Sequence, residues 1–277
     1  MLLLGLTGSI ATGKSTVSNI LRSEPYNLPI IDADVLARKV VEPGTPGYQQ
    51  ILDNFAPSTP DLLLPPDAPE CGGREDGPTG KGRPLNRPAL GRRVFGGSEE
   101  AQRLRKTLNG IVHPAVRKAM WMEMARAYIR GCWAVVLDIP LLYESGWERM
   151  CGCVMVVAVR DPEVQMKRLT DRDAFLNGED ARNRVLSQMD VREKAERCLR
   201  RGEGAGVVVW NDGGKEDLKR EIDRVMAEVR RKSPTWWAWL LLLFPPAAIT
   251  AATYNFIRSW LVQRRWQQEQ NGQKAKL

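Results

Sequence analysis

Residues 8–15 read G-S-I-A-T-G-K-S and match the phosphate-binding pattern G-x-x-x-x-G-K-[S/T] in full. The glycines allow backbone N–H groups to turn inward around phosphate oxygens, and a following helix adds partial positive charge at its N-terminus. Lys14 could reach the β- and γ-phosphates, and the hydroxyl of Ser15 could ligate Mg²⁺. An apolar run at residues 1–6 precedes the motif and a helical pattern follows it, which is the context that the chemistry requires.

A carboxylate ends another apolar run, W-A-V-V-L-D-I at residues 133–139. Asp138 is therefore expected at the carboxyl end of a buried strand, where phosphate-loop proteins hold a magnesium-side carboxylate. We expect it to bind Mg²⁺, through water, together with Ser15. The alternative is a strand-end aspartate that only caps a turn.

Two more carboxylates, Asp32 and Asp34, follow the short apolar run at residues 28–31. In a doubly wound sheet this position lies beside the phosphate loop, where a carboxylate can accept the proton of an acceptor hydroxyl. Either aspartate could instead cap a helix that begins near Val35. The residues alone leave both interpretations open.

The motifs favour a small-molecule kinase over other nucleotide-dependent proteins. A GTPase would carry an N-K-x-D guanine motif, and the sequence contains none. An oligomeric ATPase would need sensor and arginine-finger elements and usually a longer chain. A kinase needs an acceptor-side base, which Asp32 or Asp34 can supply.

Alternating strand and helix patterns must position these residues. Short apolar runs predict strands at residues 1–6, 28–31, 133–139, 154–159 and 206–210. Helical patterns fall between and after them, at residues 16–22, 35–41, 87–95, 99–130, 161–201 and 216–232. This order predicts an α/β fold with a parallel five-stranded sheet flanked by helices.

Composition sets wider bounds. A chain of 277 residues has room for about two domains. Its net charge of +8 suits an anionic partner, which could be nucleotide, nucleic acid or anionic lipid. Cys151 and Cys153 lack the second pair that a zinc site needs, so we interpret them as buried strand residues in a reducing compartment.

Several further motifs resemble the dephospho-CoA kinase family, and they occur in the family's order. They are I-D-A-D-V-L-A-R at residues 31–38, V-V-E-P-G at 40–44, L-N-R-P-A-L at 85–90, H-P at 113–114, P-L-L-Y-E at 140–144, R-D-P-E-V-Q-M-K-R-L at 160–169, R-D at 172–173 and V-V-W-N-D-G at 208–213. Asn86 stands where the family usually has Asp. Ala11 stands where the family's phosphate loop often has glycine, which we expect to be a mild change.

The resemblance implies ATP-dependent phosphorylation of the ribose 3′-hydroxyl of dephospho-CoA, giving coenzyme A and ADP in the last step of coenzyme A synthesis. It implies a nucleotide-binding core, a helical CoA domain and a lid. The core would comprise residues 1–40, 131–169 and 203–232, the CoA domain residues 41–130, and the lid residues 170–202. No nucleic-acid partner is expected, and association with other enzymes of the pathway is possible.

The resemblance also assigns residues to roles. Asp34 would be the base, with Lys14 and Arg168 as the other catalytic residues, and Ser15 and Asp138 would hold the metal. ATP would be bound by Gly8, Ser9, Ile10, Ala11, Thr12, Gly13, Lys14, Ser15, Thr16, Arg172, Asn211 and Gly213. The substrate would contact Asp32, Arg38, Arg87, His113 and Glu144. Because Pro114 follows His113, we expect His113 near the start of a helix.

Two segments depart from the common family pattern. Residues 57–84 are rich in Pro and Gly, and we expect a mobile surface insertion that buries little. Residues 236–257 form an uncharged run that spans about 33 Å as a helix, so we expect a membrane segment, with residues 233–277 as a hydrophobic segment and basic tail. Pro245 and Pro246 leave a hairpin, an interfacial anchor or a buried helix as alternatives.

These features predict a dephospho-CoA kinase anchored in a mitochondrial outer membrane or the endoplasmic reticulum, with its kinase part facing the cytosol. Two alternatives remain at this stage. One is a phosphate-loop kinase for another nucleotide or small molecule, and the other is a membrane-tethered scaffold without catalysis. Intact Lys14, Ser15, Asp34 and Asp138 disfavour the scaffold.

Overall fold

The computed structural model describes residues 1–172 and 190–274. The chain divides into two compact units, of which the first comprises Met1–Ile31 and Met124–Leu277 and the second comprises Asp32–Glu123. The predicted lid, residues 170–202, lies partly outside the described residues, because residues 173–189 are not among them.

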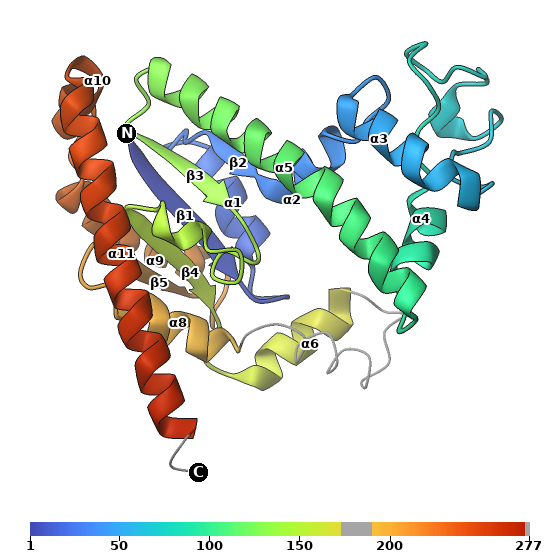
Figure 1. The fold of residues 1–277 in the computed structure, drawn as a ribbon. Helices are drawn as coiled ribbons and strands as arrows, with labels where there is room; N and C mark the ends of the chain where they lie inside the picture. The colour runs from blue at the N-terminus through green and yellow to red at the C-terminus, as the bar shows by residue number, and fades with distance from the viewer. Residues whose placement is uncertain (173–189, 275–277) are drawn as a thin grey trace. The chain divides into compact units, whose positions relative to one another are not determined.

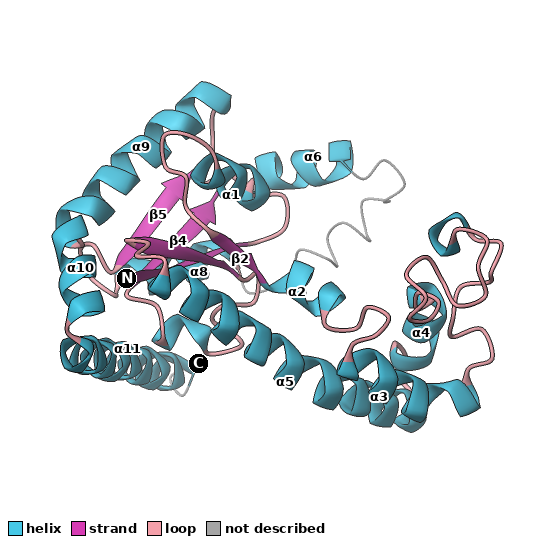
Figure 2. Cartoon of the chain, turned by 90° about the horizontal axis from the view of Figure 1, so that it is seen from above, coloured by secondary structure: helices cyan, strands magenta, loops and turns pink. Residues whose placement is uncertain are grey.

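A five-stranded sheet forms the centre of the first unit (Figure 1). The strands lie in the order β2-β3-β1-β4-β5, and the registers of β1 with β3 and β4, and of β4 with β5, are parallel. Their bounds are β1 Leu2–Gly8, β2 Ile30–Asp32, β3 Ala134–Asp138, β4 Cys153–Ala158 and β5 Gly206–Trp210. The predicted fold class is confirmed, because helices flank this sheet (Figure 2).

The central strands are almost entirely apolar, and helices cover them. Every residue of β3 and β4 is buried, as expected for parallel strands with helices on both faces. The helices that pack against its strands include α1 (Lys14–Arg22), α8 (Val191–Leu199) and α9 (Lys215–Lys232), whereas α6 (Pro162–Arg172) lies beside the loop between β1 and α1. Val17 and Leu21 of α1 and Ile222 of α9 join strand residues in one core cluster, which fixes both ends of the phosphate loop.

The second unit is helical. It contains α2 (Ala33–Lys39), α3 (Pro46–Phe55), α4 (Arg87–Val94) and the greater part of α5 (Glu99–Ile129), with short 3₁₀ turns at Ala56–Ser58 and Pro69–Cys71. The bounds of α4 and α5 lie within one residue of those predicted at 87–95 and 99–130. Its core cluster joins residues of α3 and α4 with residues between them: Tyr48, Ile51, Phe55, Leu62, Leu85, Leu90 and Val94.

The expectation that His113 lies near a helix start is wrong. His113 and Pro114 lie in the interior of α5, which has 31 residues. A proline in a helix removes one backbone hydrogen bond and crowds the carbonyl four residues earlier. Here that earlier residue is Gly110, and fifteen helical residues follow the proline before α5 ends. The helix therefore continues through a residue that usually ends one.

Residues 57–84 bury more than their composition suggests. Leu62 is 2% exposed and Cys71 is fully buried. Leu63 pairs with Leu85 in an antiparallel bridge, and the hydroxyl of Tyr48 donates a hydrogen bond to the carbonyl of Arg83 at 2.7 Å. The expectation of an insertion that buries little therefore holds for most of these residues, which are exposed or half-buried, but not for Leu62, which joins the core of the second unit.

The C-terminal segment forms two helices, α10 (Thr235–Leu243) and α11 (Pro245–Lys274), joined at Phe244. Among the described residues, no single helix is both long and apolar enough to cross a membrane. α10 and α11 meet the requirement only as a pair that is bent by 116°. Pro245 and Pro246 begin α11, where a missing N–H is tolerated, and so the predicted 22-residue run is divided between two helices.

Candidate active site

The phosphate loop joins β1 to α1 and takes a conformation that requires glycine at its end. Gly13 has φ 92°, and a Cβ built there would lie 2.3 Å from Nδ2 of Asn211. That nitrogen donates a hydrogen bond to the carbonyl of Thr12 at 2.9 Å, and the Thr12 hydroxyl donates to the carbonyl of Ser9 at 2.9 Å. The loop is thus held by its own threonine and by an asparagine that follows β5.

Ala11 has φ 61°, in the left-handed region that glycine adopts without strain. For an alanine this conformation costs about 1–2 kcal/mol. The substitution for glycine noted in the sequence is therefore a source of backbone strain in the phosphate loop, although the backbone N–H is retained.

Lys14 forms an ion pair with Asp138, whose carboxylate is buried with 2% exposure. The parallel register explains the meeting, because Leu6 of β1 lies opposite Asp138 of β3. Asp138 is therefore at the carboxyl end of a strand beside the phosphate loop. The structure thus brings Lys14 and Asp138, two of the predicted site residues, into contact.

Two side chains of α6 brace the loops around this pair. Gln165 donates a hydrogen bond to the carbonyl of Ile10 at 2.8 Å. Arg168 donates to the carbonyls of Asn211 at 2.7 Å and Gly213 at 3.3 Å. A spacing of three residues places Gln165 and Arg168 on one helix face. α6 thereby connects the phosphate loop to the segment after β5, and Arg172 is the last residue of this helix.

No functional role was predicted for Gln165 or Lys194. Lys194 of α8 is fully buried and lies 3.3 Å from a carboxylate oxygen of Glu144. Its Nζ also donates to the carbonyl of Pro140 at 3.4 Å, which accepts from the Thr7 hydroxyl at 2.8 Å. These contacts fix the segment after Asp138 that contains Glu144. The spacing of Gln165 to Arg168 was a usable signal, whereas Lys194 looks like an ordinary helix-surface lysine.

At the start of the second unit, the structure distinguishes the roles of Asp32 and Asp34, which the sequence left open. Asp32 is the N-cap of α2, and its Oδ1 accepts from the N–H groups of Asp34 at 2.9 Å and Val35 at 3.0 Å. Asp34 lies in the exposed first turn, and within the described residues its carboxylate has no hydrogen bond or ion pair. Capping thus belongs to Asp32, and the Asp34 carboxylate is available to a ligand.

The remaining predicted contacts of the substrate are exposed in the second unit. Asn86 caps α4 by accepting from the N–H of Ala89 at 3.2 Å. Asn caps helices as well as Asp does, which accounts for the departure from the family pattern. Arg87 follows in the first turn of α4, Arg38 lies in the last turn of α2, and His113 is exposed on α5.

The site offers two oxygen donors for a divalent cation. Mg²⁺ binds proteins through one or two oxygen ligands and takes its other ligands from phosphates and water. Ser15, exposed in the first turn of α1, and the Asp138 carboxylate provide such oxygens. In residues 1–172 and 190–274, no group of three acidic, His or Cys side chains could hold a metal ion alone. The residues present fit a cation that arrives with a nucleotide.

Comparison with known proteins shows that the chain is similar to dephospho-CoA kinases. The family model described as dephospho-CoA kinase matches residues 2–65 and 76–217. A dephospho-CoA kinase of Saccharomyces cerevisiae is 39% identical over 271 residues, which are 98% of this chain and 99% of the yeast protein. That of Arabidopsis thaliana is 35% identical over 237 residues, covering 86% of this chain and 87% of the plant protein.

Solved structures agree. A Thermus thermophilus protein superposes with a TM-score of 0.58 and 31% identity, covering 82% of this chain and 97% of its own. A dephospho-CoA kinase from Campylobacter jejuni has a TM-score of 0.53 and 26% identity, covering 82% and 96%. The family match omits only residues 66–75 of the predicted insertion at 57–84.

Proposed function

The chain belongs to the dephospho-CoA kinase family, and on that premise we propose how its residues divide the work of the reaction. It is an ATP-dependent kinase that phosphorylates the ribose 3′-hydroxyl of dephospho-CoA and yields coenzyme A and ADP. The proposal concerns the base, the phosphate contacts and the metal ligands.

Asp34 is the general base of this proposal. The observation that carries it is the division of labour at the start of α2, where Asp32 accepts the backbone N–H groups and leaves the carboxylate of Asp34 without a partner. A carboxylate in that state can accept the proton of the 3′-hydroxyl as the oxygen attacks the γ-phosphorus. Asp32 would then act on substrate only through the position of α2.

Lys14 and the backbone of the phosphate loop bind the triphosphate. When ATP enters, Lys14 exchanges the Asp138 carboxylate for phosphate oxygens, and its charge stabilises the transferring group. The N–H groups of residues 8–16 cradle the other phosphates. Asn211 and Gly213, whose carbonyls accept hydrogen bonds from Arg168, are proposed to bind the nucleotide near its base. Arg168 and Arg172 are proposed to approach the phosphates from α6.

Mg²⁺ enters as part of the proposal because Ser15 and Asp138 are suitable oxygen donors. A bound Mg²⁺ would neutralise phosphate charge during transfer. On the acceptor side, Arg38, Arg87, His113 and Glu144 are proposed to bind dephospho-CoA. Arginine suits its phosphates because the guanidinium stays charged and offers several donors.

The cellular location predicted from the sequence also stands as a proposal. The kinase would work at the endoplasmic reticulum or mitochondrial outer membrane, facing the cytosol, and its support is the exposed apolar character of α10 and α11. Fractionation of cells that express the full chain tests this. An association with other enzymes of coenzyme A synthesis stays a prediction.

The experiment for the reaction measures ADP and coenzyme A formed by the purified full chain from ATP and dephospho-CoA. We expect stoichiometric products that require both substrates and Mg²⁺. A parallel set of acceptors, such as adenosine and nucleoside monophosphates, tests specificity. ATP use with another acceptor and none with dephospho-CoA would contradict the assignment.

A further inference from the structure

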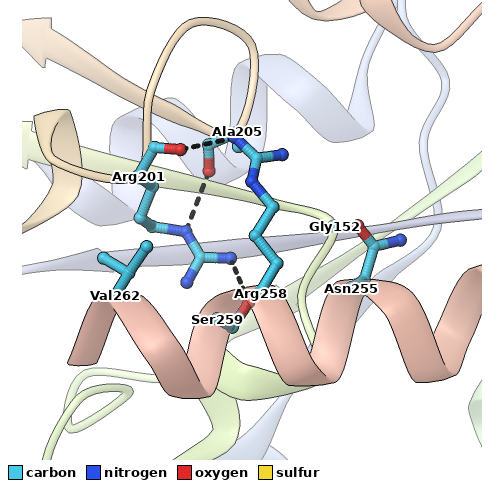
Figure 3. A pocket seen from close by; sticks show the side chains of 7 residues that line it. All are labelled: Gly152, Arg201, Ala205, Asn255, Arg258, Ser259 and Val262. Atoms are coloured by element: carbon cyan, nitrogen blue, oxygen red, sulfur yellow. Dashed lines mark hydrogen bonds between the residues drawn. The ribbon is translucent and has the colours of Figure 1, made fainter. Parts of the chain in front are cut away.

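α11 turns several polar side chains toward the rest of the first unit, whereas a row of its large apolar side chains is exposed. Three polar contacts hold its inner face, and Figure 3 draws the two that join Arg201 to Arg258 and Ser259. Arg201 donates to the Ser259 hydroxyl at 3.2 Å, Arg258 donates to the carbonyl of Arg201 at 2.7 Å, and Arg149 donates to the side-chain oxygen of Gln263 at 2.5 Å. The inner face of α11 is therefore fixed by hydrogen bonds.

The far part of α11 is fastened as well. Trp266 is 5% exposed, and the guanidinium of Arg200 lies 4.5 Å from its ring centroid. Arg200 also pairs with Glu269. In α10, the hydroxyl of Tyr128 donates to the carbonyl of Leu241 at 2.6 Å. Both helices thus pack against the rest of the first unit with one defined side. The side chains on the opposite side are exposed because of this packing.

Those outward residues are large and apolar, and we name them the outer face of α10–α11. It comprises Trp236, Trp239, Leu243 and Phe244 in the α10 region and Ile249, Tyr254, Phe256, Ile257, Trp260 and Leu261 in α11, each at least 40% exposed. A surface helix normally buries such a stripe and exposes its polar side. This inverted pattern indicates a partner that takes apolar side chains.

The charge around the outer face selects that partner. Residues 233–268 contain no Asp or Glu, whereas Arg264 and Arg265 are exposed next to the apolar stripe. Arg264 lies over the ring of Trp260, 5.4 Å from its centroid. Tryptophan and tyrosine beside arginine are typical of helices that lie at the headgroup level of anionic membranes. An anionic bilayer repels acidic side chains and so accounts for their absence from these 36 residues, whereas a protein partner would not require that absence.

We propose that the outer face of α10–α11 binds the surface of an anionic lipid bilayer, with both helices lying along it and neither crossing it. The 116° bend between the helices supports an in-plane arrangement, and α11 by itself could cross only by bringing Arg258, Ser259 and Gln263 into hydrocarbon. This inference concerns attachment and is independent of the proposed catalytic roles.

Co-sedimentation with vesicles tests the proposal. The purified full chain is mixed with vesicles of phosphatidylcholine alone or with about one third phosphatidylserine. We expect binding to the anionic vesicles, weakening as salt rises. Leu243→Ser with Ile257→Ser removes apolar contact, and we expect about tenfold weaker binding or more. Arg264→Gln with Arg265→Gln should weaken binding on the order of tenfold, on anionic vesicles only.

The control is Phe95→Ser, which removes an exposed phenylalanine of the second unit and should leave vesicle binding unchanged. Thermal melting and kinase activity of every variant show that it is folded. The proposal is overturned if wild type binds neither vesicle, or if the four substitutions leave binding unaltered. It is also overturned if light scattering shows a dimer that Leu243→Ser with Ile257→Ser dissociates. Resistance of membrane-bound chain to carbonate extraction would show a spanning segment instead.

Discussion

Lys14 of α1 and Asp138 of β3 form an ion pair at the carboxyl ends of two adjacent strands, and both belong to the proposed ATP site. In this pair the charges of Lys14 and of the buried Asp138 carboxylate neutralise each other. With the roles proposed above, Lys14 would instead face the phosphates of bound ATP, and the Asp138 carboxylate would be left to hold Mg²⁺.

Lys14→Ala should therefore have two effects. It leaves a buried carboxylate without its cation, so we expect the free energy of unfolding to fall by about 1–3 kcal/mol. It should also abolish ATP use with every acceptor, because the lost charge faces the transferring group. Denaturation and steady-state kinetics measure these effects, with Lys106→Ala, an exposed lysine of α5, as control. Unchanged ATP kinetics in the Lys14 variant would remove it from the site.

Substitutions at Ala11 and Gly13 of the phosphate loop should have opposite effects. Ala11→Gly relieves a left-handed alanine, so we expect about 1 kcal/mol of added stability and retained activity. Gly13→Ala places a methyl group against Asn211 and should weaken ATP binding strongly. Nucleotide titration and thermal melting distinguish the two. Equal effects of both substitutions would contradict the described loop conformation.

Most of the sheet and the phosphate loop could be predicted from sequence, because buried parallel strands read as apolar runs and the loop has a strict pattern. The predicted helix bounds at residues 87–95 and 99–130 were close because helical periodicity is visible there, although Pro114 wrongly suggested a helix start inside α5. The sequence could not tell which of Asp32 and Asp34 caps the helix and which is the base, since either aspartate can cap a helix. Lys194 was missed because nothing local to its helix indicates that Glu144 and Pro140 surround it.

Composition gave partly wrong expectations for two segments whose structure depends on tertiary packing. A Pro- and Gly-rich segment signals few core residues, yet one leucine in the right place is enough to join a core. The uncharged run at residues 236–257 has the length of a span, but local sequence cannot show that two prolines start a new helix whose polar side is bonded to Arg149 and Arg201.

Leu62→Ala tests whether the predicted insertion contributes to the core of the second unit. Leu62 is 2% exposed in the cluster with Ile51 and Phe55, so we expect a loss of about 2–4 kcal/mol in the free energy of unfolding. Glu70→Ala changes an exposed residue of the same segment and should be neutral. Equal melting curves for both variants would show that this segment does not pack as described.

Cysteine reactivity provides a test that does not touch the site. Burial raises the pKa of Cys151 and of Cys198 to about 12, and raises that of Cys153 well above its usual value. At pH 8 these thiols are almost entirely protonated and therefore unreactive. We expect iodoacetamide to label the half-buried Cys132 first, with kinase activity retained, as mass spectrometry can show. Rapid labelling of Cys151 or Cys198 in active enzyme would contradict their burial.

The assignment of Asp34 as the base is the central claim, and one pair of variants tests it most directly. Turnover of ATP with dephospho-CoA is measured for Asp34→Asn and Asp32→Asn. Asparagine retains the cap at position 32, so we expect Asp32→Asn to keep activity within a few-fold. Asp34→Asn should lower kcat about 10²–10⁴-fold with little change in the KM for ATP, because only the proton acceptor is lost. Near-normal turnover by Asp34→Asn, or a deeper loss in Asp32→Asn, would contradict the account.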